Sequence, residues 1–264
     1  MNYSYYPGCT LKTKAQNLEK FALHSAQALG VNLVEQEEWQ CCGAVYPLST
    51  DEIATKLASV RSLAAARDKG ESLVTLCAAC HQLMKRVNHD MQTKEDMREK
   101  VNNYLQLDDN YQGESKVIHY LELLRDEIGF ETLAQKVKVP LKGRKVAAYY
   151  GCLLLRPKEI MNFDDPERPT VLEDFLESLG ASAIHYPYKT ECCGGYLSVD
   201  KEEVVEQMVD NIIRSALEQG AEEIVTACPL CKYNLENSRL CSKGEISISY
   251  FTELLAEALD VKEA

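Results

Sequence analysis

Apolar positions along the chain alternate between two spacings, which predicts strands and helices in turn. Short runs rich in β-branched and aromatic residues at 3–6 and 146–150 predict buried strands. Apolar side chains then recur with a period near 3.6 at 18–25 and 171–179, which predicts a helix after each strand. The first two elements of the chain therefore return in the same order about halfway along it.

The same parallel continues through the rest of both halves. Further strands are predicted at 31–34 and 183–186, and helical periodicity returns at 53–64 and 205–216. Regular alternation of strand and helix is typical of α/β proteins with mainly parallel sheets. The pattern thus predicts two α/β modules, each a small sheet with flanking helices.

The cysteines repeat with the same geometry as the elements. Cys41 and Cys192 lie 151 positions apart, and so do Cys77 and Cys228. In each half a lone cysteine is followed by a Cys-Cys-Gly segment and then by a C-x-x-C pair. A repeat in both the elements and the cysteines indicates a duplicated domain, related by a pseudo-two-fold operation. The two sets are Cys9, Cys41, Cys42, Cys77 and Cys80, and Cys152, Cys192, Cys193, Cys228 and Cys231.

The division between the modules is predicted in the stretch 136–144, which contains a proline and a glycine. The first module then covers residues 1–140 and the second residues 141–264. A repeated Glu-Leu-Leu segment lies about 20 residues closer to the C-x-x-C pair in the second half. The first module is therefore expected to carry a helical insert near 90–111.

Charge and composition narrow the possible functions. The net charge of −12 and the lack of a basic stripe argue against a nucleic-acid surface. The N-terminus has neither the basic nor the apolar region of a secretion signal, and no run approaches the roughly 20 apolar residues of a membrane span. We expect a cytoplasmic protein without direct membrane insertion. Disulfides are disfavoured there, so eleven cysteines indicate metal or redox chemistry.

Each cysteine set is expected to converge at one sheet edge. Every cysteine segment comes directly after a predicted strand. In parallel α/β domains, ligands bind in the loops beyond the carboxyl ends of the strands. A C-x-x-C pair at a helix start also gains amide donors and a dipole that favour thiolates. The alternative of inert buried cysteines does not explain ten of them in strict repeat.

The number of sulfurs bears on the metal. Structural zinc takes four ligands and ordinary cubane clusters take four thiolates, so a fifth sulfur suggests a larger or more open cluster, or a reactive thiol. Adjacent cysteines diverge unless the turn is unusual, and Gly43 and Gly194 supply the needed backbone freedom. Zinc in one half and a thioredoxin-like dithiol stay open as alternatives, although a dithiol leaves six cysteines unexplained.

With these spacings the chain resembles the B-type component of heterodisulfide reductase over its whole length, with all ten cysteines present. Single modules also resemble the iron–sulfur subunits of glycolate oxidase and related dehydrogenases. The resemblance implies that each set of five cysteines holds one noncubane [4Fe-4S] cluster. It also implies that the two clusters face a cavity in which a thiol disulfide is cleaved or formed.

The resemblance further implies partners. The chain has neither a ferredoxin-type cysteine run nor a nucleotide-binding glycine fingerprint. Electrons are therefore expected from a C-type ferredoxin-like subunit and a flavin-containing A-type subunit. The expected function is that of the catalytic disulfide oxidoreductase subunit of such a complex. The alternative is a subunit that only relays electrons within a flavin dehydrogenase complex.

Histidines near the motifs have less specific interpretations. His81 follows the first C-x-x-C directly, and we expect it to cap a helix or lie at the surface, because its counterpart is Lys232. His119 stands beside the repeated Glu-Leu-Leu segment and is expected to pack in the core.

The remaining residues of interest lie near the second module or next to a motif. Arg156 and Lys189 could attract an anionic substrate, or be solvated. Trp39 could line a substrate cavity or pack under its loop, and Cys241 falls outside the repeat and is expected to be a bystander thiol.

Overall fold

Two parallel sheets form the framework of the molecule. The structure is a computed structural model that describes residues 1–43 and 51–261. Within these residues each sheet has four strands, in the orders β2-β1-β3-β4 and β6-β5-β7-β8. The strands are β1 Asn2–Tyr6, β2 Asn32–Glu35, β3 Leu73–Thr75, β4 Val117–His119, β5 Lys145–Tyr149, β6 Ser182–Ile184, β7 Glu223–Thr226 and β8 Ser247–Tyr250.

The two sheets have the same topology, which confirms the predicted duplication of an α/β domain. The register repeats as well: Tyr6 is paired with Thr75 in the first sheet, and Tyr149 with Thr226 in the second. The strand that closes each sheet, β4 or β8, was not predicted. Their length alone does not explain the omission, because β2 and β6 are as short, and Ser247–Tyr250 alternates polar and apolar side chains as a half-buried strand does.

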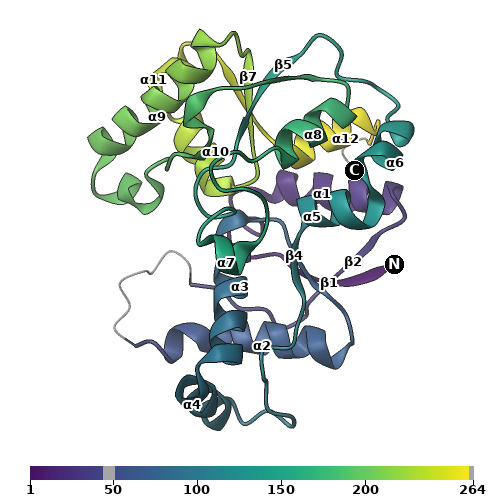
Figure 1. The fold of residues 1–264 in the computed structure, drawn as a ribbon, viewed down its shortest axis with the longest axis vertical. Helices are drawn as coiled ribbons and strands as arrows, with labels where there is room; N and C mark the ends of the chain where they lie inside the picture. Colours follow the sequence, from purple (N-terminus) through teal and green to yellow (C-terminus); the bar gives the residue numbers. More distant parts are fainter. Residues whose placement is uncertain (44–50, 262–264) are drawn as a thin grey trace.

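Helices cover both sheets (Figure 1). The long predicted helices are all present, and Pro229 occupies the first turn of α10, a position that proline favours. The helical segments are α1 Gln16–Ala28, α2 Ala54–Asp68, α3 Ala78–Thr93, α4 Glu95–Leu105, α5 Tyr120–Glu122, η1 Leu123–Ile128, α6 Phe130–Lys136, α7 Lys158–Met161, α8 Val171–Ser178, η2 Pro187–Thr190, η3 Gly195–Val199, α9 Glu202–Glu218, α10 Pro229–Glu236, α11 Arg239–Ser242 and α12 Phe251–Ala258.

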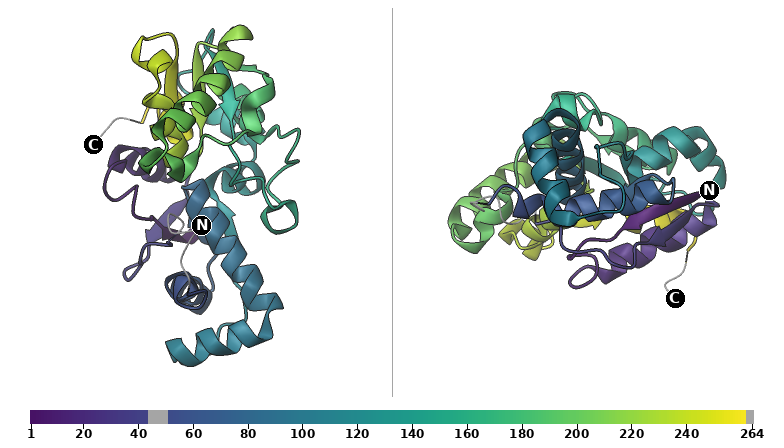
Figure 2. Two further views of the ribbon diagram at one scale, coloured as in Figure 1. Left: turned by 90° about the vertical axis from the view of Figure 1, so that its left-hand side faces the viewer. Right: turned by 90° about the horizontal axis from the view of Figure 1, so that it is seen from below.

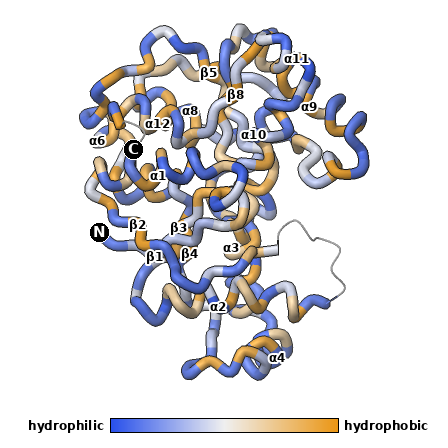
Figure 3. Tube along the Cα trace, turned by 180° about the vertical axis from the view of Figure 1, so that it is seen from behind, coloured by the Kyte–Doolittle hydropathy of each residue, from blue (hydrophilic) through white to orange (hydrophobic). Residues whose placement is uncertain are grey.

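One hydrophobic core runs through both modules. Tyr5 and Val74 of the first sheet belong to the same buried cluster as Ala147 of the second sheet and Phe251 of α12. Helices α1 and α12, one from each module, pack side by side at this junction (Figure 1). Figure 3 shows apolar positions gathered in the interior and polar ones on the outer loops. Because burial of apolar surface is the main stabilising force, the modules stabilise each other.

The first module has a second, smaller core on the far side of its sheet. Tyr6, Leu63, Met84 and Val101 are among the residues buried there. Helix α4 packs on α2 and α3 and lies at one end of the elongated molecule (Figures 1 and 2). Among the described residues no helix is long and apolar enough to cross a bilayer.

Segments of one module also reach over the other. Thr252 at the start of α12 donates its hydroxyl hydrogen to the carbonyl oxygen of Leu18 in α1, at 2.9 Å. In the opposite direction, α7 of the second module lies beside α3 (Figure 1). The hydroxyl of Tyr250 donates to the carbonyl oxygens of Leu76 and Ala227, at 2.6 and 3.3 Å. These two carbonyls belong to different modules, so one buried side chain joins both.

Replacing Tyr250 with phenylalanine tests this junction. The side chain is fully buried, and its loss removes a hydrogen bond from two carbonyls that each keep another donor, His119 for Leu76 and Ala78 for Ala227. We expect the free energy of unfolding to fall by about 0.5–1.5 kcal/mol, measured by urea titration. Tyr233→Phe is the matched control, because Tyr233 is 58% exposed and its change should stay within about 0.5 kcal/mol. Equal stability of Tyr250→Phe and the unchanged protein would contradict a stabilising role for this contact.

Candidate functional site

The ten cysteines lie at the carboxyl ends of the strands, as the sequence predicts. Cys9 and Cys152 follow β1 and β5, and Cys77 and Cys228 are the N-cap residues of α3 and α10 directly after β3 and β7. Thiolates at a helix N-terminus are stabilised by amide groups and the helix dipole. Each sheet therefore presents five sulfurs at one edge.

Within the first module the sulfurs approach one another in two groups. The Sγ atoms of Cys9 and Cys41 are 3.5 Å apart, and those of Cys42 and Cys80 are 3.4 Å apart. Cys41 and Cys42 thus approach different cysteines, although their own thiols also interact with each other. Gly43 follows them with φ of 81°, in the left-handed region that glycine favours.

The second module repeats this arrangement. The Sγ atoms of Cys152 and Cys192 are 4.0 Å apart, and those of Cys193 and Cys231 are 3.4 Å apart. Gly194 follows the pair with φ of 85°. Two equivalent sites, each with divergent adjacent cysteines, are therefore built from the same local structure.

A tyrosine at the end of a central strand fixes each Cys-Cys-Gly loop. Tyr6 donates its hydroxyl hydrogen to the carbonyl oxygen of Gln40, at 2.5 Å. Tyr149 donates to the carbonyl oxygen of Glu191, at 2.8 Å. Both acceptors directly precede the cysteine pair, and both tyrosine rings are buried. The repeated Tyr-Tyr segment before the first cysteine thus positions the second and third cysteines as well.

The glycine before each first cysteine makes room for a sulfur. A Cβ atom on Gly8 would lie 2.8 Å from Sγ of Cys80, and one on Gly151 would lie 3.3 Å from Sγ of Cys231. Both glycines have positive φ, 75° and 63°. A side chain there would both strain the backbone and displace a cysteine. Glycine is thus part of the sulfur arrangement in both modules.

The two cysteine sets meet at the junction of the modules. The thiols of Cys77 and Cys228 are close enough to shift each other's pKa. Beside them, the amide of Ala78 donates to the carbonyl oxygen of Ala227, at 3.3 Å. Both cysteines are more than nine-tenths buried. The starts of the two C-x-x-C helices are therefore in contact across the junction.

Hydrogen bonds among the thiols lower the pKa of some cysteines and raise that of others. Bonds from Cys228 and Cys80 hold the pKa of Cys77 well below its ordinary value, although burial opposes this. The bond with Cys231 lowers the pKa of Cys228, but Cys77 and burial raise it to about 12 overall. The bond from Cys152 lowers the pKa of Cys192 to about 6. Each set thus contains a cysteine with a lowered pKa, which favours the thiolate form that binds metals.

Two residues of the site were not found from the sequence. Tyr196, on η3 directly after the second Cys-Cys-Gly segment, is half-buried, and burial and then the thiols of Cys228 and Cys77 raise its pKa. Asn234, on α10, is buried and donates hydrogen bonds to the loop that carries Cys193. A tyrosine and an asparagine near a motif carry no signal of their own, so only the fold could identify them.

The expectation that His81 caps a helix or lies at the surface is wrong. His81 is fully buried inside α3, and its Nε2 lies 3.2 Å from Oε2 of Glu122. The second module covers this part of α3, since Gln82 donates to the carbonyl oxygen of Arg156, at 2.8 Å. The contacts of His81 itself lie within its own module: its ring packs edge-on against His119, with centroids 5.4 Å apart, and its Nδ1 lies 3.1 Å from the hydroxyl oxygen of Thr75.

The glutamate of the repeated Glu-Leu-Leu segment has the same role in both modules: it lies beside His81 in the first and beside Lys232, the residue at the equivalent position, in the second. Glu122 accepts the backbone N–H of His119, and Glu253 accepts that of Tyr250, each at 2.6 Å. Glu253 also lies 3.1 Å from Lys232. Each glutamate therefore caps a helix and pairs with the residue after C-x-x-C.

The structure confirms that His119 packs in the core. It is fully buried, and its ring contacts Phe163 and Phe251. Trp39 packs edge-on against Tyr6, with centroids 6.0 Å apart. Cys241 is half-buried on α11, outside both sulfur sets.

The two basic residues considered for substrate binding form internal contacts instead. Lys189 pairs with Glu173 at 2.5 Å and donates to the carbonyl oxygen of Pro169. Arg156 pairs with Glu167 at 3.1 Å and donates to the carbonyl oxygen of Thr190. These bonds fix the loops around the second cysteine set.

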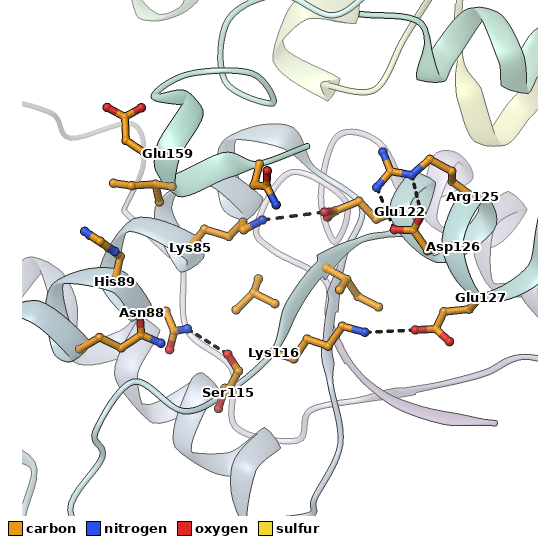
Figure 4. Close-up of a pocket in the computed structure, with 15 residues that line it drawn as sticks. Lys85, Asn88, His89, Ser115, Lys116, Glu122, Arg125, Asp126, Glu127 and Glu159 are labelled. Carbon is orange, nitrogen blue, oxygen red and sulfur yellow. Dashed lines mark hydrogen bonds and ion pairs between the residues drawn. The ribbon is translucent and has the colours of Figure 1, made fainter. Parts of the chain in front are cut away.

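A polar pocket of about 440 Å³ lies beside α3 and β4 (Figure 4). Its cationic side chains are each opposed by a carboxylate: Lys85 by Glu122 at 3.8 Å and Lys116 by Glu127 at 3.1 Å. Arg125 likewise pairs with the neighbouring Asp126. With Glu159 the lining has one more carboxylate than cation, and cysteines are not among its lining residues.

A second cavity of about 420 Å³ touches both modules. It is lined by Thr10 and Pro229, each of which directly follows a cysteine of a different set. Leu18, Leu230 and Tyr233 add apolar and aromatic surface to its wall. This cavity therefore opens beside the first cysteine of one module and the C-x-x-C helix of the other.

The donor set fits a polynuclear cluster better than a single ion. Among the described residues, no three His, Cys, Asp or Glu side chains are grouped so as to hold one metal ion. Close sulfur contacts join Cys9 with Cys41, and Cys80 with Cys42 and Cys77, whereas tetrahedral zinc needs only four ligands around one point. Each set offers five thiols, and all of them except the exposed Cys41 are buried or half-buried, which suits an iron–sulfur cluster better than a single zinc ion.

Comparisons with known proteins agree with this geometry. The chain is 31% identical to the 8-methylmenaquinol:fumarate reductase membrane anchor subunit of Wolinella succinogenes, over 98% of this chain and 92% of that protein. It is 32% identical to a protein of Archaeoglobus profundus that is named as similar to the B-type component of heterodisulfide reductase, over 94% of this chain and 86% of that protein.

The fold is also known from a solved structure. A hypothetical protein from Helicobacter pylori superposes with a TM-score of 0.76 at 15% identity, covering 99% of this chain and 49% of the other. This likeness concerns the fold alone. The pattern of the CCG cysteine-rich domain matches residues 3–85 and again 146–236, the segments that carry the two cysteine sets. The chain therefore belongs to the CCG cysteine-rich domain family, in a tandem form that is similar to the B-type component of heterodisulfide reductase.

Proposed function

We propose that this chain is the catalytic iron–sulfur subunit of a heterodisulfide reductase-type complex. In this function it reduces a small-molecule disulfide, or runs the reverse reaction, with electrons from partner subunits. Two electrons and two protons convert one disulfide into two thiols. The proposal places the subunit in the cytoplasm, where reduced cysteines are available for metal binding.

The observation that carries the proposal is the contact between the two cysteine sets at Cys77 and Cys228. A disulfide has two sulfurs, and its reduction takes two electrons. Two equivalent redox sites whose ligands touch across a junction can act on both ends of one bond. A single module, or two modules with distant sites, could not provide this arrangement.

The ten cysteines are the proposed ligands, five for each of two noncubane [4Fe-4S] clusters. Bound clusters of this kind would supply one-electron redox chemistry and iron positions open to a substrate sulfur. The fifth thiol in each set, beyond the four of a cubane, supports the noncubane type. The protein holds the thiols in place through Tyr6 and Tyr149 and shields them by burial.

The cavity beside Thr10 and Pro229 is the proposed approach for the substrate. Its volume of about 420 Å³ suits a small molecule. The ammonium group of Lys14 and the ring of Tyr233 lie in its wall, so it offers both a charge and an apolar surface. It touches the segments that follow Cys9 and Cys228, one from each set.

The proposed clusters pass electrons on but are not their source. The electrons must therefore come from other proteins. We propose a C-type ferredoxin-like subunit and a flavin-containing A-type subunit as donors. Relatives support membership of a larger complex, since several of them are named as subunits of heterodisulfide reductases.

A second candidate function is electron relay without disulfide chemistry, in a flavin dehydrogenase complex. The similarity to a component of a fumarate reductase at 31% identity favours it. The adjacent sites would then form a path for electrons between two partners. The candidates differ in one property, because only the catalytic function requires the clusters to bind a substrate sulfur.

Metal analysis with a spectroscopic assay separates these functions. We expect about eight irons and a similar amount of acid-labile sulfide per chain. After oxidation in the presence of small thiols such as 2-mercaptoethanol and glutathione, a thiol-dependent EPR signal is expected. Clusters whose signal does not respond to any thiol would favour relay. Zinc without sulfide would contradict both functions.

Single cysteine replacements test whether each set serves its own cluster. Cys42→Ser should remove about half of the iron and leave the second cluster, and Cys193→Ser should do the reverse. Iron analysis and EPR measure both effects. Cys241→Ser is the matched control, because this thiol lies outside both sets and its loss should not change the iron content. Loss of both clusters from either single variant would argue against two independent sites.

A further inference from the structure

Asn234 is a buried polar residue that contacts the second cysteine set. Its side chain lies on α10, three residues after Cys231, and is only 4% exposed. Its amide nitrogen Nδ2 donates to the carbonyl oxygen of Cys193 at 3.0 Å and to that of Gly195 at 3.2 Å. The same nitrogen lies 3.6 Å from Sγ of Cys193 as a hydrogen-bond donor, and because it carries two hydrogens for three acceptors, one hydrogen is shared between a carbonyl oxygen and this sulfur. The amide thus contacts both the loop and the sulfur that the loop carries.

The direction of this hydrogen bond follows from the neighbouring carbonyls. If the amide were turned around, its Oδ1 would face the carbonyl oxygens of Cys193 and Gly195, and no hydrogen would lie between them. Among the described residues Oδ1 has no hydrogen-bond partner in the orientation found. The two carbonyls therefore hold the N–H side of Asn234 toward Sγ of Cys193.

We infer that Asn234 raises the reduction potential of the iron–sulfur cluster held in the second module. This inference rests on the proposed function, because Cys193 is one of the proposed ligands. Reduction adds one electron, and hence negative charge, that is shared with the ligand sulfurs. An N–H donor pointed at such a sulfur stabilises the reduced state more than the oxidised state. Burial strengthens the effect, since Cys193 is only 3% exposed.

The first module does not supply this donor from the equivalent position. Asn234 lies 151 positions after Leu83, the same offset that relates Cys193 to Cys42. The side chain of leucine has no N–H group. Elsewhere the two sites agree closely: the Cys42–Cys80 and Cys193–Cys231 sulfur distances are both 3.4 Å. Asn234 is therefore a local addition to an otherwise repeated sulfur arrangement.

Replacing Asn234 with leucine, the residue of the first module, tests the inference. In an EPR-monitored redox titration of the full chain, we expect the potential of the second cluster to fall. A tenfold change in its one-electron equilibrium, which corresponds to about 59 mV, is the expected size. The potential of the first cluster should not change. An unchanged second potential at full iron content would overturn the inference.

Ser198→Ala is the matched control for effects of loop geometry. The hydroxyl of Ser198 donates to the carbonyl oxygen of Gly195, at 3.0 Å, so its loss weakens the same loop without removing the donor to sulfur. The one-electron equilibrium constant of the second cluster should then stay within about twofold of its value in the unchanged protein. A shift as large as that of Asn234→Leu would show that loop geometry, not the hydrogen bond, sets the potential.

Asn234→Asp keeps the size of the side chain but replaces the donor with a carboxylate. We expect it to lower the second potential at least as much as Asn234→Leu does. Loss of iron from the second site in both variants would assign Asn234 to holding the loop alone and would overturn the inference. Iron and sulfide analysis of the unchanged protein precedes these comparisons. An absence of clusters there would instead refute the proposed function itself.

Discussion

The buried junction around Tyr250 is the contact on which the site depends. Its hydroxyl bridges carbonyl groups of Leu76 and Ala227, the residues that directly precede the two C-x-x-C pairs. Cys77 and Cys228 are therefore held together by the backbone on either side, and not by their thiols alone. The shared core and the packing of α1 on α12 reinforce this contact. Each module positions five sulfurs, and the junction decides that the two sets face each other.

Duplication gives the two modules the same sheet topology, but the segments around their cysteine sets differ. The segment between the first cysteine and the cysteine pair has 31 residues in the first module and 39 in the second. The longer segment includes α7, which packs on α3 across the junction. The shorter segment leaves the cavity between Thr10 and Pro229 beside α10. Single positions differ as well, since Asn234 beside one sulfur set corresponds to Leu83 beside the other. Equal backbones can therefore carry two sites with different electrostatic surroundings.

The sequence alone determined the α/β class, the duplication and the assignment of cysteines to two sets. Each of these depends on local periodicity or on spacing, which remain visible in a linear chain. It also indicated that five sulfurs exceed the needs of zinc or a cubane. It did not identify β4 and β8, or the burial of His81, which depends on packing against Thr75, His119 and Glu122.

Only the tertiary structure decided how the two sets are related. The contact of Cys77 with Cys228, the bridge from Tyr250, and the approach of Asn234 to Cys193 join residues through space. Such contacts depend on how helices and sheets pack, because a hydrogen bond requires atoms about 3 Å apart regardless of their separation along the chain. The linear sequence contains the ligands, and the packing of the modules brings the two sets of ligands together.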